Sequence, residues 1–487
     1  MATAPRSDTS TLVDDNDQSS FQSEKFTSIS TSILRDDDEF RALERKILRK
    51  VDFRLTPLFS AICAISLVDR GNLAYAGIMG LNDALGLTTG NRYNIVSMIF
   101  FIPYILMQLP LNVLFPRIGA RKFITFVVIS WGAVELGMGF VKHWGELALL
   151  RVLLGALECG FFPAAIFIMT TWYKRLEVQQ RLSAFYLGTQ ILAAMSQFLS
   201  YAVVRLGGQA GLDSWQWIFL IYGLITIALG FLNWVVVPDF PTANRFLTEK
   251  ETNIILARVE DDRGDAIPDE ITLRKVLNHA TDWTIWAYGL MFLAASMLTN
   301  FVAYFGPMII RDMGWSSATA ILLTTPPNFF AAAVCALSGY FSDRTGHRAG
   351  FIVIQALVMI LGMCLTGFTS GNAPRYLGLY FMQAGSVSAC PSILAYSSNN
   401  IRTHSKRAVS SAVILAQAGF GGVIATTIFR IKDAPRYWPG VWTTLGLQIM
   451  LIGLVGMTSM TYMKRNRDRR AGRVSELEGS STFYHTL

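Results

Sequence analysis

The sequence predicts an all-α membrane protein with twelve transmembrane helices in two six-helix bundles. Of its 487 residues, 52% are hydrophobic and only 16% are charged, whereas a soluble protein devotes about a quarter of its residues to charge. Apolar stretches of about 20 residues, enough for a helix to cross roughly 30 Å of hydrocarbon, recur along the chain. One long polar stretch divides them into two sets, and the alternating pattern of an outer-membrane barrel is absent.

The N-terminal tail, residues 1–50, lacks the apolar core and cleavage site of a removable signal peptide. Residues 1–40 are rich in Ser, Thr and Asp and are expected to be disordered, because they cannot bury enough apolar surface to fold. The tail is predicted to pass from disordered to amphipathic, and the first transmembrane helix is expected to serve as the targeting signal.

The first predicted bundle covers residues 51–237. Each of its six helices is an apolar stretch between polar or turn-forming segments. The predicted bounds are Leu55–Tyr75, Tyr93–Leu114, Phe123–Val141, Leu147–Trp172, Leu182–Val204 and Trp217–Val237.

Residues 238–282 are predicted to form a cytoplasmic linker, since they open with PDFPT and contain the charged runs TEKE and EDDRGDAIPDE. The second bundle follows at residues 283–463, and residues 464–487 form a cytoplasmic C-terminal tail. The predicted bounds of its helices are Trp283–Phe305, Ala318–Phe341, Phe351–Phe368, Tyr376–Ser397, Val409–Phe429 and Val441–Met463. Prolines and the run GFGG at residues 419–422 are expected to permit bends and close helix crossings. The prolines are Pro103, Pro110, Pro163, Pro326, Pro327 and Pro391.

The positions of the basic residues along the chain indicate the role of its net charge of +8. One basic cluster precedes the first helix and another follows the last, so the positive-inside rule predicts that both termini are cytoplasmic. The loops after helices two, four, eight and ten fall on the same side and also carry Lys and Arg. The charge therefore indicates membrane topology and not a nucleic-acid partner, and the plasma membrane is the expected location.

Two loops at equivalent places in the two halves are similar: NVLFPRIGARK from Asn112 and GYFSDRTGHRA from Gly339. Similarity between halves is typical of transporters built from parallel repeats, which bind substrate near the midplane. The second loop resembles the G-x-x-x-D-R-x-G-x-[RK] signature of the major facilitator superfamily, a gating motif. The matching residues are Gly339, Asp343, Arg344, Gly346 and Arg348.

The first loop departs from this signature, because Asn112 and Pro116 replace the Gly and the Asp. Its role as a charge latch is therefore in doubt. The alternative for both loops is topology alone, in which the cations only anchor the cytoplasmic face.

Four ionisable residues lie inside predicted spans: Asp69 and Arg70 in the first helix, and Arg151 and Glu158 in the fourth. A charge at membrane depth costs roughly 2.5–3.5 kcal/mol on insertion scales, so such residues usually face a partner or a wet pathway. At 1.5 Å per residue, Asp69 lies about 21 Å along its helix and Glu158 about 17 Å along the other. Arg151 and Glu158 are nearly two turns apart and share one helix face.

This group predicts recognition of a small organic anion and a proton. An arginine stays charged in low dielectric and can grip a carboxylate with two hydrogen bonds, so Arg70 and Arg151 are the predicted anion ligands. A buried carboxyl can exchange a proton near physiological pH, so Asp69 and Glu158 are predicted to couple transport to protons. In the structural alternative, Asp69 pairs with Arg151 or Glu158 pairs with Arg70, and these ion pairs only brace the bundle.

Glu135 is a further intramembrane acid, without a basic neighbour in sequence. A snorkelling contact or an interhelical hydrogen bond is expected for it, and proton coupling is the less favoured alternative. The second half has neutral polar residues in place of charges, and Tyr304, Asn399 and Gln417 are predicted to contact substrate. Such residues also hold membrane helices together without binding a ligand.

The five cysteines lie inside predicted helices, with no CxxC pair and no nearby His cluster. Apolar packing is the expected role, and no metal, disulfide or cofactor is predicted. An enzyme is not predicted either, because no nucleophile–base pair or phosphate loop emerges. The five are Cys63, Cys159, Cys335, Cys364 and Cys390.

Longer segments resemble one branch of the superfamily, the anion:cation symporters, and within it the fungal allantoate permease group. These segments are DRGNLAYA, RVLLGALECGFFPA, WQWIF, PDFPTANRFLTEKE, SSNNIRTHSKRA and DAPRYWPG. The resemblance implies proton-linked import of small carboxylates such as ureides, nicotinate, pantothenate or biotin. It also implies substrate and proton roles for Asp69, Arg70, Arg151 and Glu158, and a structural role for Lys406 and Arg407.

The leading hypothesis is thus a proton-coupled symporter that works by alternating access, functions as a monomer in a lipid bilayer and binds a small organic anion. One alternative keeps the fold and exports an anionic metabolite of a fungal biosynthetic cluster. Another is a nutrient sensor that does not transport, although its tails carry no recognisable signalling domain.

Overall fold

The computed structural model describes residues 37–241, 244, 246–263, 278–279, 281–401, 404–430, 433–434, 436–473 and 484–486. Most of the predicted disordered tail and most of the acidic run in the predicted linker lie outside these residues. The chain divides into two compact units, Met1–Phe53 and Arg54–Leu487. In the first unit the described element is the beginning of α2, and everything below concerns the second unit.

The first half of the chain is helical throughout its predicted spans. The elements are α2 (Asp37–Ala76), a π-helical turn (Gly77–Leu81), α3 (Asn82–Ala84), α4 (Arg92–Met98), α5 (Phe101–Ile118), α6 (Ala120–Met138), α7 (Trp144–Glu158), α8 (Phe161–Trp172), α9 (Arg175–Val203) and α10 (Ser214–Val236). Four of the spans, in α2, α6, α9 and α10, are continuous helices in their membrane part, and the other two are interrupted.

A helix, α11, lies in the segment between α10 and α13, and the second half of the chain follows it. The spans of this half are longer on average than the predicted apolar stretches. The elements are α11 (Glu249–Arg263), α13 (Trp283–Asp312), α14 (Ser317–Leu323), α15 (Thr325–Thr345), α16 (Arg348–Phe368), α17 (Asn372–Asn400), α18 (His404–Ile428) and α19 (Trp438–Arg470).

Among the described residues, nine helices are long and apolar enough to span a membrane, and a bent pair of helical segments, Arg92–Gln108 and Pro110–Ile118, makes a tenth span. Two more polar helices, α6 and α17, have 19 and 29 residues and are also long enough to cross. Each packs closely on an apolar neighbour: a Cβ on Gly223 of α10 would lie 2.7 Å from the Leu136 nitrogen of α6, and one on Gly362 of α16 would lie 2.6 Å from the Met382 nitrogen of α17. Nine or ten spans are thus identified by length and composition, and these two helices are long enough to supply the other two of the twelve predicted crossings.

Three of the crossings are broken, and a proline follows each break. Pro103, Pro163 and Pro326 lie within the first three residues of α5, α8 and α15. Proline has no amide hydrogen and its ring clashes with the carbonyl four residues earlier, so a helix cannot run through it undisturbed. These prolines were expected to permit bends, and the structure shows that the helices are interrupted there.

The helix ends differ from the predicted spans mostly by extension into polar sequence. For example, α19 continues to Arg470 and α13 to Asp312, beyond the predicted Met463 and Phe305. Hydropathy marks the part of a helix that can lie in hydrocarbon, whereas the backbone hydrogen bonds continue into charged residues.

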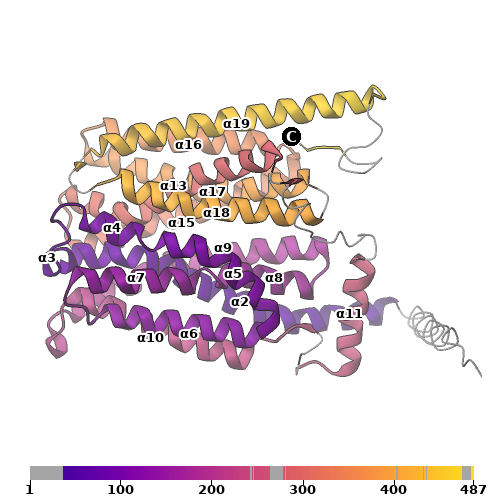
Figure 1. Ribbon diagram of the computed structural model, residues 1–487, viewed down its shortest axis with the longest axis horizontal. Helices are drawn as coiled ribbons and strands as arrows, with labels where there is room; N and C mark the ends of the chain where they lie inside the picture. Colours follow the sequence, from indigo (N-terminus) through magenta and orange to yellow (C-terminus); the bar gives the residue numbers. More distant parts are fainter. Residues whose placement is uncertain are drawn as a thin grey trace, which may run out of the picture. The chain divides into compact units, whose positions relative to one another are not determined.

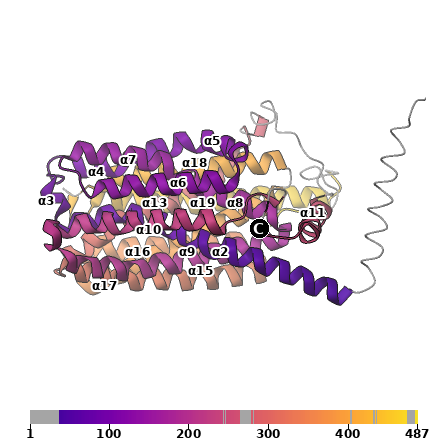
Figure 2. The same cartoon turned by 90° about the horizontal axis from the view of Figure 1, so that it is seen from below.

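Figures 1 and 2 show the helices of this unit running alongside one another, and Figure 1 shows those of the first half grouped apart from those of the second. The α5–α6 loop, which contains Gly119, and the α15–α16 loop, which contains Gly346, lie at one end of the helices. We call this the motif end. At the opposite end, aromatic side chains of both halves meet, and we call this the aromatic end. Its members are Tyr93, Phe301, Phe305, Phe429 and Tyr437.

Glycines of α18 let the two halves approach closely. A Cβ on Gly419 would overlap the side chain of Ile105, and one on Gly422 would overlap the ring of Phe101, both on α5. The run GFGG therefore forms the close helix crossing that it was expected to permit.

Candidate functional site

Helix α2 carries Asp69 and Arg70 next to each other, and they serve different neighbours. Successive residues of a helix point about 100° apart. Asp69, which is 1% exposed, makes its contact with α6, whereas Arg70 makes its contact with α7. The site therefore consists of two parts that share one helix.

Arg70 and Glu158 form an ion pair between α2 and α7. Nε and Nη2 of Arg70 donate to Oε1 of Glu158 at 3.1 and 2.9 Å, and Ser66 Oγ donates to the same oxygen at 2.5 Å. The guanidinium also lies over the rings of Phe100 and Tyr104, at 5.5 and 5.0 Å from their centroids. Oε2 of Glu158 is buried and has no hydrogen-bond partner. One of the two ion pairs left open by the sequence is thus present.

Asp69 is held by α6 and by its own helix. Trp131 Nε1 donates to Oδ2 at 2.8 Å, and Asn72 Nδ2 donates to Oδ1 at 3.3 Å. The same Asn72 nitrogen donates to Oε1 of Glu135 at 2.9 Å, and Glu135 is only 1% exposed. The interhelical hydrogen bond considered for Glu135 is present, and it brings this acid into the group around Asp69.

The sequence carried a signal for this second cluster. Trp131 and Glu135 are four residues apart and lie on one face of α6, and Asp69 and Asn72 are three apart on one face of α2. What the spacing leaves undetermined is that these two faces meet.

Arg151 lies on α7 with a fully buried side chain. Its three guanidinium nitrogens have no hydrogen-bond partner. Burial of a charge without such a partner is costly, because the group loses its hydration and gains nothing in return. Its positive charge acts on Glu135, Tyr93 and Tyr304. The alternative ion pair of Asp69 with Arg151 is not formed, since the hydrogen bonds of Asp69 come from Trp131 and Asn72.

The end of α7 places Glu158 at a helix break. Pro163 cannot donate to the carbonyl of Cys159, so α7 stops at Glu158 and α8 starts at Phe161. Gly155, one turn earlier, packs against the backbone of Phe100, whose carbonyl oxygen any added Cβ would overlap. This close approach holds the charged face of α7 against the α4–α5 crossing.

Tyr304, a residue of the second half, lies near the charged residues of the first half. It is fully buried on α13, its hydroxyl has no hydrogen-bond partner, and it lies within electrostatic range of Arg151, Arg70 and Glu158. Gln417 lies instead against Gly289 in the α13–α18 packing, and Asn399 lies in the last turn of α17. Among the described contacts, neither reaches the charged group, and substrate roles for these two residues stay predictions.

The loop between α15 and α16 contains the predicted gating motif. Nη2 of Arg348 lies 2.7 Å from Oδ1 of Asp343, which makes an ion pair inside the motif, and Arg344 donates to the hydroxyl of Tyr340 at 3.3 Å. Gly346 ends α15 with φ of 71°, a left-handed conformation that favours glycine. A Cβ added to Gly339 would have no atom of another helix within 4 Å, so no helix packs closely on this glycine in this conformation.

In the equivalent loop of the first half, the acidic residue comes from a different segment of the chain. Gly119 has φ of 95°, and the next residue, Ala120, donates its amide to Oδ1 of Asp239 at 2.8 Å. Arg121 donates to the carbonyl of Val237 at 3.2 Å. Asp239, from the PDFPT segment, thus caps α6 where the motif lacks its own Asp at Pro116.

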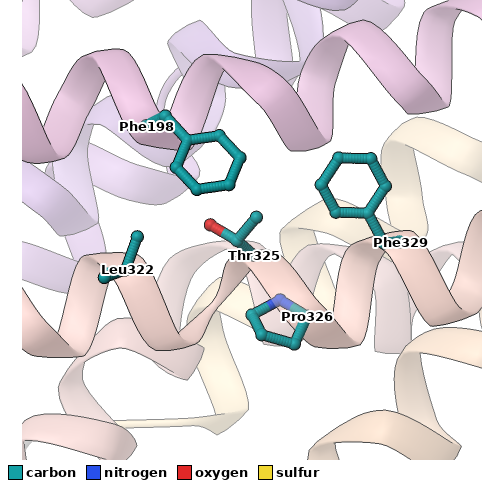
Figure 3. A pocket seen from close by; sticks show the side chains of 5 residues that line it. All are labelled: Phe198, Leu322, Thr325, Pro326 and Phe329. Carbon is teal, nitrogen blue, oxygen red and sulfur yellow. The ribbon is translucent and has the colours of Figure 1, made fainter.

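A groove of about 500 Å³ lies between α9 and the α14–α15 pair, away from the predicted site residues. Figure 3 shows its lining, which is apolar except for Thr325. The lining residues are Phe198, Leu322, Thr325, Pro326 and Phe329. Phe198 and Phe329 are also exposed on the outer surface of the unit, so this groove lies on the face expected to contact lipid and does not resemble a site for an anion.

Metal and disulfide chemistry find no support in the described part of the chain. No group of three His, Cys, Asp or Glu side chains there is placed to hold a metal ion, and the five cysteines are free thiols.

The profile of the Major Facilitator Superfamily matches residues 59–426. Similar curated proteins include an uncharacterised transporter of Schizosaccharomyces pombe, which is 29% identical over 88% of this chain and 85% of its own. The MFS-type transporter cnsO of Penicillium expansum is 28% identical over 91% and 88%, and the major facilitator-type transporter hxnP of Emericella nidulans is 26% identical over 88% of each chain.

Solved structures agree on the fold. The inward-open xylose transporter XylE of E. coli has a TM-score of 0.66 at 12% identity, and the alignment covers 83% of this chain and 95% of that one. A bacterial homologue of the human lysosomal transporter Spinster has a TM-score of 0.61 at 14% identity, with 84% and 95% covered. These matches confirm the predicted all-helical membrane fold.

Proposed function

The chain belongs to the major facilitator superfamily of secondary transporters, and we propose that it carries a small organic anion together with protons by alternating access. Its family is one of transporters and not of enzymes. The anion class proposed is a carboxylate of the size of a vitamin or ureide, and the resemblance to anion:cation symporters supports this choice.

The observation that carries the proposal is the unpartnered guanidinium of Arg151. It is fully buried, all three of its nitrogens lack hydrogen-bond partners, and the hydroxyl of Tyr304 within its electrostatic range is also unpartnered. A carboxylate would supply acceptors for both groups and neutralise the buried charge. A neutral solute would leave the guanidinium without a directly hydrogen-bonded anion.

The Arg70–Glu158 pair supports coupling to protons. While Glu158 is ionised it occupies Arg70, as the hydrogen bonds at 2.9 and 3.1 Å show. A proton bound to Glu158, whose Oε2 is unpartnered, would remove the charge that holds Arg70. The substrate carboxylate could then bind Arg70 in place of Glu158, so proton and anion would bind together.

The conformation fits one stage of this cycle. Asn94 of α4 donates to the carbonyls of Thr426 and Phe429 at 2.6 Å each, and Tyr93 donates to the carbonyl of Tyr304 at 3.0 Å. These bonds join the two halves at the aromatic end. We place the motif end in the cytoplasm on the positive-inside rule, which makes this an outward-closed state.

The test is a labelled-uptake screen of vitamins, ureides and other carboxylates in a host that lacks its own permeases. For the anion that is taken up, Arg151→Ala and a protonophore should each abolish accumulation. Arg205→Ala, which removes an exposed arginine stacked on Tyr201, is the matched control and should leave uptake intact. Uptake that resists both Arg151→Ala and the protonophore would defeat the proposal.

A further inference from the structure

The cluster around Asp69 contains two carboxyl groups and few donors. Asp69 and Glu135 are each 1% exposed, and one amide nitrogen of Asn72 donates to both, at 3.3 and 2.9 Å. Trp131 supplies one more N–H, to Asp69. Both donors are neutral, so no cation is hydrogen-bonded to either carboxyl.

The count of donors and acceptors shows what is missing. Oε2 of Glu135 and Oδ1 of Asn72 are both buried and have no hydrogen-bond partner. Buried polar atoms in folded proteins are almost always paired. One added proton on the carboxyl pair would supply a donor to a cluster that has a surplus of acceptors.

The charges around the two carboxyls also indicate that one of them is protonated. Two carboxylates that share one site cannot easily both be ionised, because like charges repel strongly where water is excluded. From α7, Glu158 adds a negative charge and Arg151 a positive one, and Tyr222 of α10 also lies within range of Asp69. Since Glu158 is already paired with Arg70, one positive charge faces the two carboxyls, and one ionised carboxyl balances it.

We infer that Glu135 is the second member of a proton-sharing pair with Asp69, separate from the Arg70–Glu158 pair. This rests on the proposed function and deepens it, because it adds a second proton-binding site, on two carboxyls of α2 and α6, to the one proposed at Glu158. Binding adds one H⁺ from water to the pair and changes its charge from −2 to −1, and release returns that H⁺ to water on the other side. Asn72 and Trp131 are positioning residues, which hold the two carboxyls within reach of one amide nitrogen.

A purely structural role for Glu135 predicts different behaviour. A glutamate that only anchors α6 to Asn72 would be replaced well by glutamine, whose side-chain oxygen accepts the same hydrogen bond. A proton-sharing glutamate would not, since glutamine cannot ionise. The two roles are separated by protonation itself, which needs no substrate to measure.

The experiment is infrared difference spectroscopy of the purified full chain in lipid nanodiscs, titrated with pH in H₂O and D₂O. The probe is the protonated-carboxyl C=O stretch. The wild type should show this band at neutral pH, and Glu135→Gln and Asp69→Asn should each remove it. The remaining carboxyl of each variant would have lost the neighbour with which it shares the proton. Glu135→Asp, which keeps an acid, should retain a band at a shifted frequency.

Glu146→Gln is the matched control. Glu146 is an exposed glutamate in the first turn of α7, so its replacement should leave the neutral-pH band unchanged. Persistence of the band in Glu135→Gln, or its absence from the wild type, would overturn the inference. Because no anion is present, failure to find a transported substrate would count against the proposed function and leave this result unaffected.

Discussion

At the scale of single residues, the partly buried Arg70 and the fully buried Arg151 differ in their electrostatic surroundings. Arg70 is compensated by an internal carboxylate, with its Nη2 2.9 Å from Glu158. Arg151 lacks a hydrogen-bonded partner altogether. A buried guanidinium can scarcely be deprotonated, and the carboxyl pair of Asp69 and Glu135 acts on Arg151 only through its charge, so the guanidinium nitrogens can hydrogen-bond directly to an anionic ligand. The proposed roles of the two arginines follow from this difference: Arg70 is released by a proton, and Arg151 is available from the start.

Glu158→Gln tests whether the Arg70–Glu158 pair couples proton and anion movement. The glutamine oxygen can still accept from Arg70, but it cannot bind or release a proton at physiological pH. We expect accumulation driven by a pH gradient to be lost while exchange of labelled for unlabelled anion continues. Both are measured in reconstituted vesicles, with the exposed Glu146→Gln as control. Gradient-driven accumulation equal to that of the wild type would show that this pair is only structural.

Arg151→Lys tests the geometry of anion recognition. Lysine keeps the charge but loses the planar fork that gives two parallel hydrogen bonds. We expect a loss of about 1.5–3 kcal/mol of binding, which is roughly a ten- to hundredfold rise in KM. The measurement is the concentration dependence of initial uptake rates. An unchanged KM in Arg151→Lys would mean that no bidentate contact is made.

At the scale of elements, the site depends on how α7 packs and where it ends. Pro163 fixes the break after Glu158, and Gly155 allows the backbone of α7 to contact that of Phe100. Together they place Arg151 and Glu158 on a face that is pressed against the α4–α5 crossing. The position of the charges is therefore a property of helix packing and not only of sequence spacing.

Gly155→Ala should destabilise the protein, because its Cβ would overlap the Phe100 carbonyl oxygen and the two helices would have to separate. Overpacking of this kind costs about 1–3 kcal/mol. Gly145→Ala is the matched control on the same helix, since nothing lies within 4 Å of its Cβ. Thermal unfolding of both variants in detergent gives the comparison. Equal unfolding temperatures would show that this contact is not tight.

The C-terminal residues also dock on the second half. Asn466 exchanges two hydrogen bonds with the backbone of His485, at 2.8 and 3.0 Å, and Asn400 does the same with Thr486, at 3.1 and 2.9 Å. The His485 ring stacks on Tyr462, with centroids 4.3 Å apart. Burial and the nearby positive charges of Arg465 and Lys406 lower the pKa of His485 to about 4.

This shift predicts how docking of the C-terminal residues depends on pH. An undocked histidine has an ordinary pKa of about 6.5, so between pH 6.5 and 4 the undocked state binds more protons than the docked one. Docking is therefore strongest above pH 6.5 and weakens as the pH falls toward 4. Hydrogen–deuterium exchange of residues 484–486 at pH 7.5 and pH 5 measures it. His485→Phe should remove the pH dependence; equal protection of the wild type at both pH values would contradict the assignment.

At the scale of the whole molecule, hydropathy and charge were sufficient to predict the fold class and the four intramembrane charges. They did not predict which helix faces meet, because the spacing of Asp69 and Asn72 defines a face of α2 but not its neighbour. Glu135 was consequently recognised from the sequence as an intramembrane acid with an expected interhelical hydrogen bond, but its place beside Asp69 follows only from the structure. The same reason explains Asp239, whose contact with Ala120 joins residues far apart in sequence.

The two halves also differ in what they bring to the site. The first half supplies all the charged groups, and the second supplies Tyr304 and the glycine contacts of α18. Because the halves are hydrogen-bonded at the aromatic end through Tyr93 and Asn94, these bonds have to break when that end opens. Alternating access in this protein would thus move the second half, which is neutral at the site, relative to the first half, which carries the charged residues.

Binding of the anion by Arg151 can be measured without transport, as ligand-dependent thermal stability of the purified protein. A ligand at 100 times its Kd stabilises the folded state by about 2.7 kcal/mol, which is readily detected as a rise in Tm. The anion found by uptake should raise the Tm of the wild type and of Arg205→Ala but not that of Arg151→Ala, and its uncharged amide analogue should have no effect. An equal rise in Arg151→Ala would contradict it.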